Sequence, residues 1–567
     1  MFIPATTEET AALGWERPDI ILVTGDSYVD SPNIGVSVIG HTLMRAGFKT
    51  VIIPQPRTDT PEDITRFGEP LLFWGVTSGC VDSMVSNYTA SGKRRRGDDL
   101  TAGLVNNRRP DRALIVYSNL IRRYYKDTVP IVLGGIEAGL RRIAHYDWKS
   151  SSVRGSILFD AKADIIVYGM GENTVTTLAG LLRNKREWRD TKGICFISKT
   201  PRPGFVELPS PESAASDKSA FIRMFNLFYE NSVTPSGKGL IQKHGDRWLV
   251  QNPPAHSLSP SELDAAAELP YERDAHPVHK AEGEVRALDT IRFSVTTHRG
   301  CAGECSFCSI AAHQGKSVIS RSEDSIIREI ESFTSHPKFK GVVSDIGGPT
   351  ANMYMLRCGN SDSGNPCVSG QCLYPAPCGN LKPGHKAQIR LLERVRALDK
   401  VKKGFVSSGI RHDLVVWDKE YGYEYLRTLL ENHTPGRLRV APEHTEERVL
   451  RVMKKPPFKI FRSFMELFKK ASRGLKPEPS VSCYLIAAHP GSDMEDMRIM
   501  DGKIGKTLGY TPEDVQIFTP LPSTYSTAVY YTETDPYTGK SIFVEKNIRE
   551  KETQKKTVVK SMHKKKN

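Results

Sequence analysis

The sequence predicts an α/β protein in two parts, an N-terminal doubly wound parallel sheet followed by a partial (β/α)6 barrel. Apolar runs of strand length alternate with amphipathic helical stretches along most of the 567 residues. Glycine turns close several of these runs, and a second series of strands and helices begins at Ile291. Apolar strands separated by helices are typical of parallel sheets that are covered on both faces.

The first series predicts an N-terminal domain over residues 1–199. A buried-strand run at Ile20–Gly25 precedes a helix over Gly35–Ala46, in which apolar residues recur at spacings of three and four. The later strands are expected at Thr50–Pro54, Leu71–Gly75, Ala113–Tyr117, Pro130–Gly135 and Asp164–Gly169. Ligands in such sheets bind at the carboxyl ends of the strands, where the glycine turns lie.

Residues 200–290 are expected to form a connecting region. Proline-rich pieces alternate there with a helical stretch at Ala220–Tyr229 and with the segment HGDRWLVQNPP, which is typical of a hairpin that runs into a linker.

The second series predicts a barrel domain over residues 291–535. Its first strand, Ile291–Thr297, is followed by an amphipathic helix over Ser322–Phe333 that Ser322 can cap. The further strands are expected at Gly341–Gly348, Gly404–Gly409, Arg437–Glu443, Ser480–Gly491 and Val515–Pro522. Barrel chemistry is carried by residues at the carboxyl ends of the strands.

The net charge of +14 gives only weak support to nucleic-acid binding. Residues 551–567 hold seven lysines and one glutamate, so that +6 of the total lies in the last stretch of the chain. A lysine-rich end with little apolar content is typical of a solvated tail, which we assign to residues 536–567.

The location expected from the sequence is the cytoplasm. The first residues, MFIPATTEETAALGW, lack the basic and apolar regions of a signal peptide, and no apolar run reaches membrane-spanning length. We therefore expect no membrane partner. Ten cysteines without a secretory signal indicate a reducing compartment, where thiols are available for metals.

Three cysteines stand directly after the first barrel strand, at the spacing Cys-x3-Cys-x2-Cys. They are Cys301, Cys305 and Cys308. Three thiolates at this spacing can hold three irons of a 4Fe–4S cluster and leave the fourth iron without a protein ligand. The alternative is a zinc site, for which His298 or His313 would supply the fourth ligand.

A second group of cysteines lies in an insertion over residues 351–384, after the second barrel strand. It contains Cys358, Cys367, Cys372 and Cys378 among many glycines and prolines. Because such a segment has little apolar material for a core, it is expected to order around zinc or a second 4Fe–4S cluster. The alternative is four reduced cysteines without a metal. We expect the insertion to cover the mouth of the active site.

The motif CAGECSFC, with Phe307 directly before the third cysteine, resembles that of the radical S-adenosylmethionine superfamily. The resemblance implies a 4Fe–4S cluster on Cys301, Cys305 and Cys308, with S-adenosyl-L-methionine at its open iron. It also implies cleavage of this cosubstrate to a 5′-deoxyadenosyl radical, and a reductant such as flavodoxin or ferredoxin.

The same resemblance implies roles for residues at the ends of two further strands. The superfamily carries a Gly-Gly-Glu-type motif at the second strand, whose backbone binds the methionine amino group; here Gly347 and Gly348 are kept and proline replaces the glutamate. Glycines let the backbone approach a ligand closely. Glu443 can accept hydrogen bonds from the ribose, or instead form a salt bridge with Arg411 or Arg439.

Longer stretches make the resemblance more specific. They are HYDWKSSSVRGSILFDAKADIIVYGMGE, LIQKHGDRWLVQNPP, VTTHRGCAGECSFCSI, SDIGGPTANMY, VAPEHTEERVLRVMKKP and VQIFTPLPSTYSTAVYYT. Together they resemble the YgiQ-type radical S-adenosylmethionine proteins over nearly the whole chain. The resemblance implies the order of the two domains and leaves the substrate unknown.

The N-terminal half resembles the cobalamin-binding-type domain that precedes the radical domain in some members of the superfamily. The stretches PIVLGG and ADIIVYGMGE carry this resemblance. The chain lacks the Asp-x-His-x-x-Gly loop whose histidine would bind cobalt. We therefore expect a cobalamin-free derivative of that domain, with cobalamin an unlikely cofactor.

Two alternative functions stay open at this point. The first is an RNA-modifying, methylthiotransferase-like enzyme, although its additional N-terminal cluster needs three cysteines and only Cys80 and Cys195 precede Cys301. The second is an iron–sulfur redox or sensor protein that never cleaves the cosubstrate.

Overall fold

The computed structural model describes residues 1–232, 237–362, 371–510, 512 and 514–559, which divide between two compact units. Unit 1 comprises Met1–Leu258, Ala265–Arg292 and Leu521–Ser523. Unit 2 comprises Ser259–Asp264, Phe293–Pro520 and Thr524–Asn567. Most of residues 200–290, which the sequence assigns to a connecting region, therefore belongs to unit 1.

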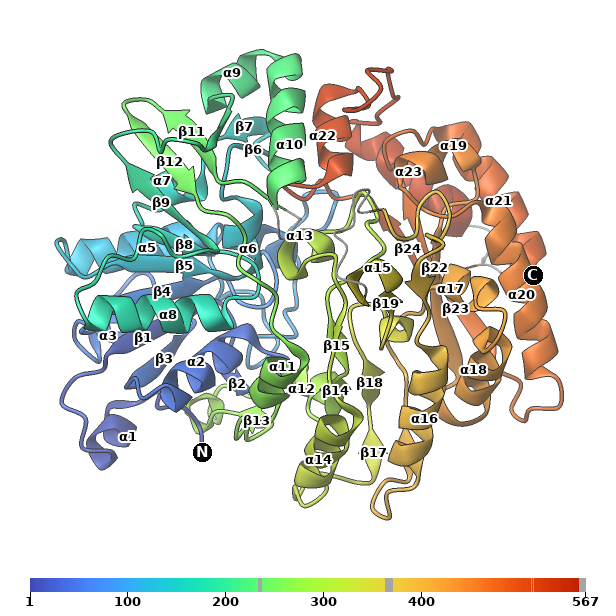
Figure 1. Ribbon diagram of the computed structural model, residues 1–567, viewed down its shortest axis with the longest axis horizontal. Helices are drawn as coiled ribbons and strands as arrows, with labels where there is room; N and C mark the ends of the chain where they lie inside the picture. The colour runs from blue at the N-terminus through green and yellow to red at the C-terminus, as the bar shows by residue number, and fades with distance from the viewer. Residues whose placement is uncertain (233–236, 363–370, 511, 513, 560–567) are drawn as a thin grey trace. The chain divides into compact units, whose positions relative to one another are not determined.

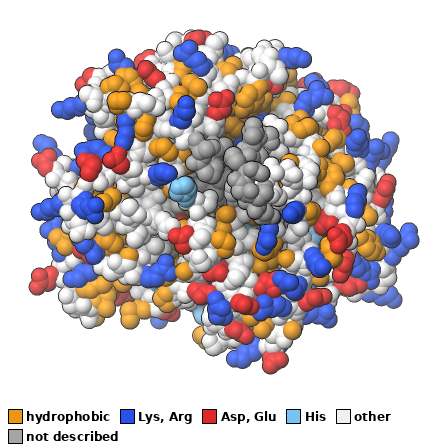
Figure 2. All heavy atoms as spheres, in the orientation of Figure 1, with side chains coloured by type: hydrophobic (Ala, Val, Ile, Leu, Met, Phe, Trp, Pro, Cys, Tyr) orange, Lys and Arg blue, Asp and Glu red, His pale blue; other side chains and the backbone are white. Residues whose placement is uncertain are grey.

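Charges of both signs are mixed on the surface. On the face that Figure 2 shows, Lys and Arg side chains lie among Asp and Glu side chains and do not gather into one broad basic patch. Exposed ion pairs such as Arg394 with Asp324, at 2.7 Å, are part of this pattern. In the described part of the chain, no helix has both the length and the apolar character required to cross a membrane.

Unit 1 is built on a nine-stranded sheet with the order β10-β11-β12-β9-β8-β5-β4-β1-β3 (Figure 1). Its parallel half consists of β1 (Ile20–Thr24), β3 (Thr50–Pro54), β4 (Phe73–Thr77), β5 (Ile131–Gly134) and β8 (Ile165–Val167). In β1 and β3 every residue is buried, as the continuous apolar runs predict. The predicted doubly wound sheet is confirmed.

Helices α2 (Gly35–Arg45) and α8 (Glu172–Arg183) contact each other beside this sheet (Figure 1). The strand predicted at Ala113–Tyr117 is wrong, because these residues open helix α5 (Ala113–Tyr124). The buried residues of α5 include Leu114, Tyr117 and Leu120, so the helical period becomes visible only over a window longer than the apolar run itself.

The segment predicted as a hairpin and linker extends the sheet. Strands β11 (Leu240–His244) and β12 (Arg247–Gln251) form the hairpin, and β12 pairs antiparallel with β9 (Ile194–Ser198). Strand β10 (Val206–Leu208) adds to β11 in parallel. The hairpin itself is confirmed, and its pairing places it within unit 1.

Unit 2 contains six parallel strand positions that are paired in chain order (Figure 1). They are β14 (Ser294–Thr296), the interrupted strand β17 (Val342–Val343) and β18 (Asp345–Gly347), β21 (Lys403–Gly404), β22 (Arg437–Glu443), β23 (Ser480–Ala487) and β24 (Asp514–Ile517). A parallel bridge between Ile410 and Val440 joins the third position to the fourth. The predicted partial barrel is confirmed, and its carboxyl ends share one edge.

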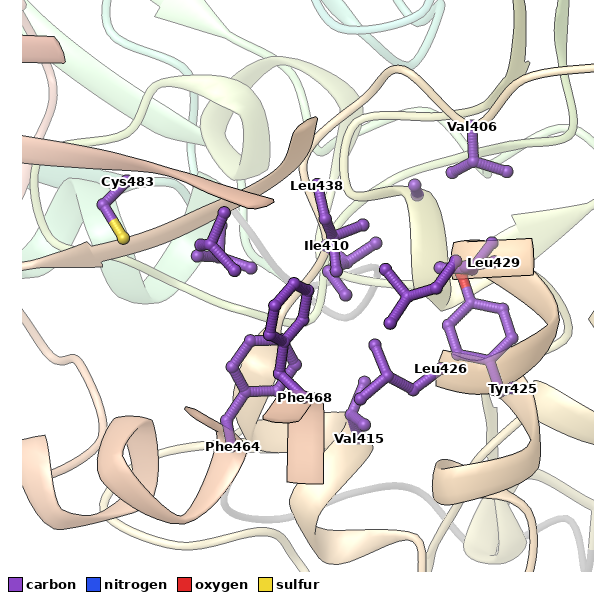
Figure 3. Packing of buried hydrophobic residues seen from close by; sticks show 14 of the residues in the cluster. Val406, Ile410, Val415, Tyr425, Leu426, Leu429, Leu438, Phe464, Phe468 and Cys483 are labelled. Atoms are coloured by element: carbon purple, nitrogen blue, oxygen red, sulfur yellow. The ribbon is translucent and has the colours of Figure 1, made fainter. Parts of the chain in front are cut away.

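The core of unit 2 lies between these strands and the helices that cover them. Helix α20 (Phe458–Ser472) contributes Phe464 and Phe468, which lie near Val415 and Leu438 (Figure 3). Aromatic side chains recur along α20 at spacings of three and four, which places them on one helical face.

The described part of the predicted tail ends in an anchored helix, and residues 560–567 lie outside the described residues. Residues Ile548–Val559 form helix α23, which buries Val558 in the core of unit 2. Gln554 Oε1 accepts a hydrogen bond from Ala488 N at 2.9 Å, and Lys551 Nζ donates to Tyr530 Oη at 2.8 Å. The prediction of a solvated tail is therefore wrong for this helix. The sequence did not reveal the helix because two of its three buried side chains are polar and give no apolar pattern.

We expect Val558→Ala to lower the free energy of unfolding by about 2 kcal/mol, since it removes buried methyl groups from the core. Lys556→Ala, on the exposed side of the same helix, is the control and should change it by less than about 0.5 kcal/mol. Chemical denaturation measures both variants. Equal stability of the two would contradict the packing of α23.

Candidate active site

The three motif cysteines lie in one loop beyond the carboxyl end of strand β14. The loop runs from β15 (His298–Arg299) to α13 (Ile310–Gln314). Within it, Cys308 N donates a hydrogen bond to Cys305 O at 3.0 Å, which fixes the turn between these two cysteines. The loop also carries Cys301, so that one short segment presents all three thiols, as the spacing predicts.

Two of the thiols receive polar contacts from other groups. Gly303 N donates to Cys301 Sγ at 3.4 Å, and Thr350 Oγ1 lies 3.5 Å from the same sulfur. Arg411 Nη1 donates to Cys305 Sγ at 3.7 Å. Donors directed at sulfur stabilise a thiolate relative to a thiol, and they are common around iron–sulfur ligands.

Burial makes the uncompensated thiolates unfavourable. It raises the pKa of Cys301, and it raises the pKa of Cys308 to about 12; the charge of a neighbouring Cys305 thiolate raises both further. A bound metal centre would offset this repulsion, because its positive charge favours the deprotonated ligands. The chemistry of the donor set therefore fits a metal cluster.

The zinc alternative needs a fourth ligand beside the three cysteines, whereas a 4Fe–4S cluster with one open iron needs only the three. Among the described residues, no three His, Cys, Asp or Glu side chains are arranged around a single ion position. His298, the first suggested zinc ligand, is buried, and its Nδ1 lies 2.9 Å from Thr297 Oγ1.

Gly347 ends strand β18, Gly348 follows it, and both are closely surrounded by side chains of unit 2. A Cβ on Gly347 would lie 2.9 Å from Ser408 Oγ, and a Cβ on Gly348 would lie 2.5 Å from His298 Cε1. Asp345, at the start of the same strand, accepts hydrogen bonds from the backbone N–H groups of Ser407 and Ser408. The neighbouring side chains therefore favour glycine at both positions even without a bound ligand.

Glu443 ends strand β22 in a strained conformation. Its φ is +68°, and the register with β23 shifts between Val440 and Glu443. Burial raises its pKa, while Lys455, whose Nζ lies 3.8 Å from Glu443 Oε1, opposes that rise. Its charge in turn raises the pKa of Cys308. Strain of this kind in a buried charged residue is typical of functional sites.

The salt bridge of Glu443 is not one of the two that the sequence suggested, with Arg411 or with Arg439. Its ion-pair partner is Lys455, whereas Arg411 pairs with Asp413 and Arg439 Nη1 donates to Ser407 O at 3.2 Å. Sequence reasoning missed both Lys455 and the role of Arg411. Neither carries a spacing signal, because each reaches the site from a segment distant in sequence from the cysteines.

A buried hydrogen-bonded network holds the middle of the cysteine loop. Ser306 N donates to Met453 O, and Ser306 O accepts from Ser526 N at 2.9 Å. The Ser306 and Ser526 hydroxyls lie 2.7 Å apart, and Ser526 Oγ lies 2.8 Å from His489 Nε2. Burial lowers the pKa of His489 to about 3, so this imidazole is neutral. Phe307 packs edge-on against His489 with ring centroids 5.9 Å apart.

The cysteine insertion folds around a short ribbon. Strands β19 (Arg357–Cys358) and β20 (Leu381–Lys382) pair antiparallel, with Cys358 opposite Leu381. Cys378 N donates to Cys372 O at 2.8 Å, and Cys378 O accepts from Leu381 N at 2.9 Å. These bonds bring Cys358, Cys372 and Cys378 into one small region. Cys367 lies outside the described residues.

Solved structures with a similar fold include two of the radical S-adenosylmethionine methyltransferase TsrM from Kitasatospora setae. The form with cobalamin and a [4Fe-4S] cluster bound has a TM-score of 0.52 at 14% identity, over 90% of this chain and 77% of that one. The form with its tryptophan substrate and aza-SAM has a TM-score of 0.50 at 15% identity, over 89% and 74%. At 14% and 15% identity, the similarity to these structures establishes a shared fold and nothing further.

This likeness corrects the expectation that cobalamin is an unlikely cofactor. The fold shared over most of the chain is one that has been solved with cobalamin bound. The expectation rested on the absence of one loop, Asp-x-His-x-x-Gly, and therefore on the absence of one cobalt ligand. A missing ligand to cobalt does not exclude the cofactor from a domain of this fold.

Sequence comparisons cover both units. Residues 2–294 match the model of the radical SAM N-terminal family, and residues 295–501 match that of the radical SAM superfamily. A UPF0313 protein of Fusobacterium nucleatum is 48% identical over 98% of both chains, and one of Thermotoga maritima is 44% identical over 99% of this chain and 98% of its own. The chain therefore belongs to the UPF0313, or YgiQ-type, family of the radical S-adenosylmethionine superfamily.

Proposed function

We propose that this protein is a radical S-adenosylmethionine enzyme whose cluster is held by Cys301, Cys305 and Cys308. The observation that carries the proposal is the single loop beyond β14 that presents three thiols, with N–H donors directed at two of them and the Thr350 hydroxyl beside Cys301. Membership of the superfamily and the partial barrel support the same assignment. Because no cysteine in the described part forms a disulfide, a reducing, cytoplasmic setting is part of the proposal.

The cluster, when bound and reduced by a one-electron donor such as flavodoxin or ferredoxin, supplies the electron that splits S-adenosylmethionine into methionine and a 5′-deoxyadenosyl radical. With the cluster held by Cys301, Cys305 and Cys308, such a radical would take a hydrogen atom from a C–H bond of the substrate and would leave 5′-deoxyadenosine and a substrate radical. The chain's own residues bind the cosubstrate and keep water away from these species.

Residues at two strand ends provide the cosubstrate contacts in this proposal. The backbone at Gly347 and Gly348 receives the methionine amino group, and the carboxylate of Glu443 accepts hydrogen bonds from the ribose. Burial raises the pKa of Glu443, and the Lys455 ammonium opposes this rise and so favours the ionised carboxylate, the stronger acceptor. Phe307, which packs edge-on against His489 and directly precedes Cys308, would help to exclude water from the bound cluster.

The methylthiotransferase-like alternative is less well supported by the positions of the cysteines. Cys195 is fully buried within strand β9. An N-terminal cluster also needs three cysteines, and only Cys80 and Cys195 precede Cys301. The redox or sensor alternative differs from the enzyme in one observable, the formation of 5′-deoxyadenosine.

We expect Cys305→Ala to lose the cluster, because it removes one of three ligands. Anaerobically reconstituted wild type should contain about four irons per chain and form 5′-deoxyadenosine when reduced with S-adenosylmethionine. Cys195→Ala, in unit 1, is the matched control and should retain both properties. A full iron complement in Cys305→Ala would refute the assignment, and an iron-loaded wild type that forms no 5′-deoxyadenosine would favour the sensor.

We expect Glu443→Gln to weaken S-adenosylmethionine binding about tenfold, since a neutral amide is a poorer hydrogen-bond acceptor than a carboxylate. Glu446→Gln is the control, because its carboxylate pairs with Lys503 at 2.9 Å. Equilibrium dialysis of the reconstituted proteins gives both affinities. If the two variants bind equally well, Glu443 has no role in binding the cosubstrate.

We further propose that the insertion over residues 351–384 binds its own metal through Cys358, Cys372 and Cys378, with Cys367 as the fourth thiolate. Backbone bonds place the segments of Cys358, Cys372 and Cys378 next to one another, which supports this proposal, while their three side chains do not converge on one ion position in the structure. The insertion follows the carboxyl end of β18, which is consistent with a cover over the active site.

Metal analysis of the triple variant Cys301→Ala, Cys305→Ala, Cys308→Ala tests this second site. Residual zinc of about one per chain, or iron of about four, is expected. A folded triple variant that contains no metal, and in which all four insertion thiols react freely with an alkylating agent, would show that these cysteines bind no metal.

A further inference from the structure

Arg411 is a buried cation beside the cysteine loop that the proposed chemistry does not use. It follows Ile410, whose bridge to Val440 fixes this part of the sheet, and it precedes helix α17 (His412–Trp417). Its side chain is only 7% exposed. Its Nη1 donates to Cys305 Sγ at 3.7 Å, within hydrogen-bond range for sulfur.

The other two nitrogens of the guanidinium, Nε and Nη2, donate hydrogen bonds to Asp413. Arg411 Nε lies 2.9 Å and 3.1 Å from the two carboxylate oxygens, and Nη2 also donates to this carboxylate. The backbone is held as well, because Arg411 N donates to Asn352 Oδ1 at 2.8 Å and Asn352 Nδ2 donates to Arg411 O at 3.0 Å. The side chain therefore has little freedom to leave the sulfur.

The electrostatics agree with this geometry. Burial alone lowers the pKa of Arg411, but Asp413, followed by Cys305 and Cys301, raises it above the ordinary value. Burial raises the pKa of Asp413, yet Arg411 outweighs this and brings it down to about 2. Both groups are thus ionised. Because Asp413 lies on the Nε and Nη2 side, the positive end of the pair faces Cys305.

Gly303, inside the motif itself, leaves the space that the guanidinium needs. A Cβ at this position would overlap Arg411 Nη1 and would lie 3.3 Å from Cys301 Sγ. The φ of Gly303 is not in the left-handed region, so the backbone would accept alanine. The absence of a side chain is therefore required by the approach of Arg411.

We propose that Arg411 is a positioning residue that fixes Cys305 and raises the reduction potential of the cluster. This inference rests on the proposed function. A cluster gains one negative charge when it is reduced, and an N–H donor and a cation beside a ligand sulfur stabilise that added charge. Loss of the Arg411 contact therefore makes reduction harder and shifts the midpoint potential to more negative values.

Three variants test the proposal, and they perturb the buried Arg411–Asp413 pair to different extents. Gly303→Ala displaces the guanidinium from Cys305 while it keeps both Arg411 and Asp413. Arg411→Lys keeps a charge but loses the planar fork that reaches both partners. The double variant Arg411→Gln, Asp413→Asn removes both charges together, so that no buried carboxylate is left unpaired. Arg390→Lys, at an exposed ion pair of the same unit, is the control.

The measurement is the midpoint potential of the reconstituted cluster, followed by electron paramagnetic resonance during redox titration, together with iron content. Gly303→Ala and the double variant should bind a full cluster and shift the potential to more negative values, with a smaller shift for Arg411→Lys and none for Arg390→Lys. Unchanged potentials in Gly303→Ala and the double variant at full iron content would overturn the proposal. A wild type that takes up no cluster would instead overturn the proposed function, and this inference with it.

Discussion

The parallel pairing of six strands in chain order is the constraint on which the site in unit 2 depends. Because every strand runs in the same direction, all the carboxyl ends meet at one edge. The cysteine loop, the glycine pair and Glu443 each follow or end a different strand, so they come together only through this pairing. The helices on the outside, such as α20, bury the apolar faces that keep the strands in register.

Buried charge is the second feature of the site, and it occurs in pairs. Glu443 is matched by Lys455, and Arg411 is matched by Asp413. An isolated buried ion would be costly, whereas removing one member of such a pair leaves the other uncompensated. These pairs contribute more to the electrostatics of the thiol loop than to stability, since replacing buried pairs by apolar residues is often neutral or stabilising.

The sequence predicted the parts whose signal is local. The spacing of Cys301, Cys305 and Cys308 and the strand Arg437–Glu443 can be read within a few residues, and the structure contains both. Ala113–Tyr117 was misassigned because a short apolar run is the same in a buried strand and in a helix. Helix α23 and the contact of Arg411 with Cys305 could not be predicted, because polar side chains buried against distant segments leave no periodic pattern.

In the proposed function, the loop of Cys301, Cys305 and Cys308 holds a cluster with one iron open to S-adenosylmethionine. Electron paramagnetic resonance of the reduced, reconstituted protein with and without S-adenosylmethionine tests this arrangement, because a ligand on the open iron changes the spectrum of the cluster. We expect a clear change in the spectrum when the cosubstrate is added. An unchanged spectrum at saturating cosubstrate, in protein with a full iron complement, would contradict it.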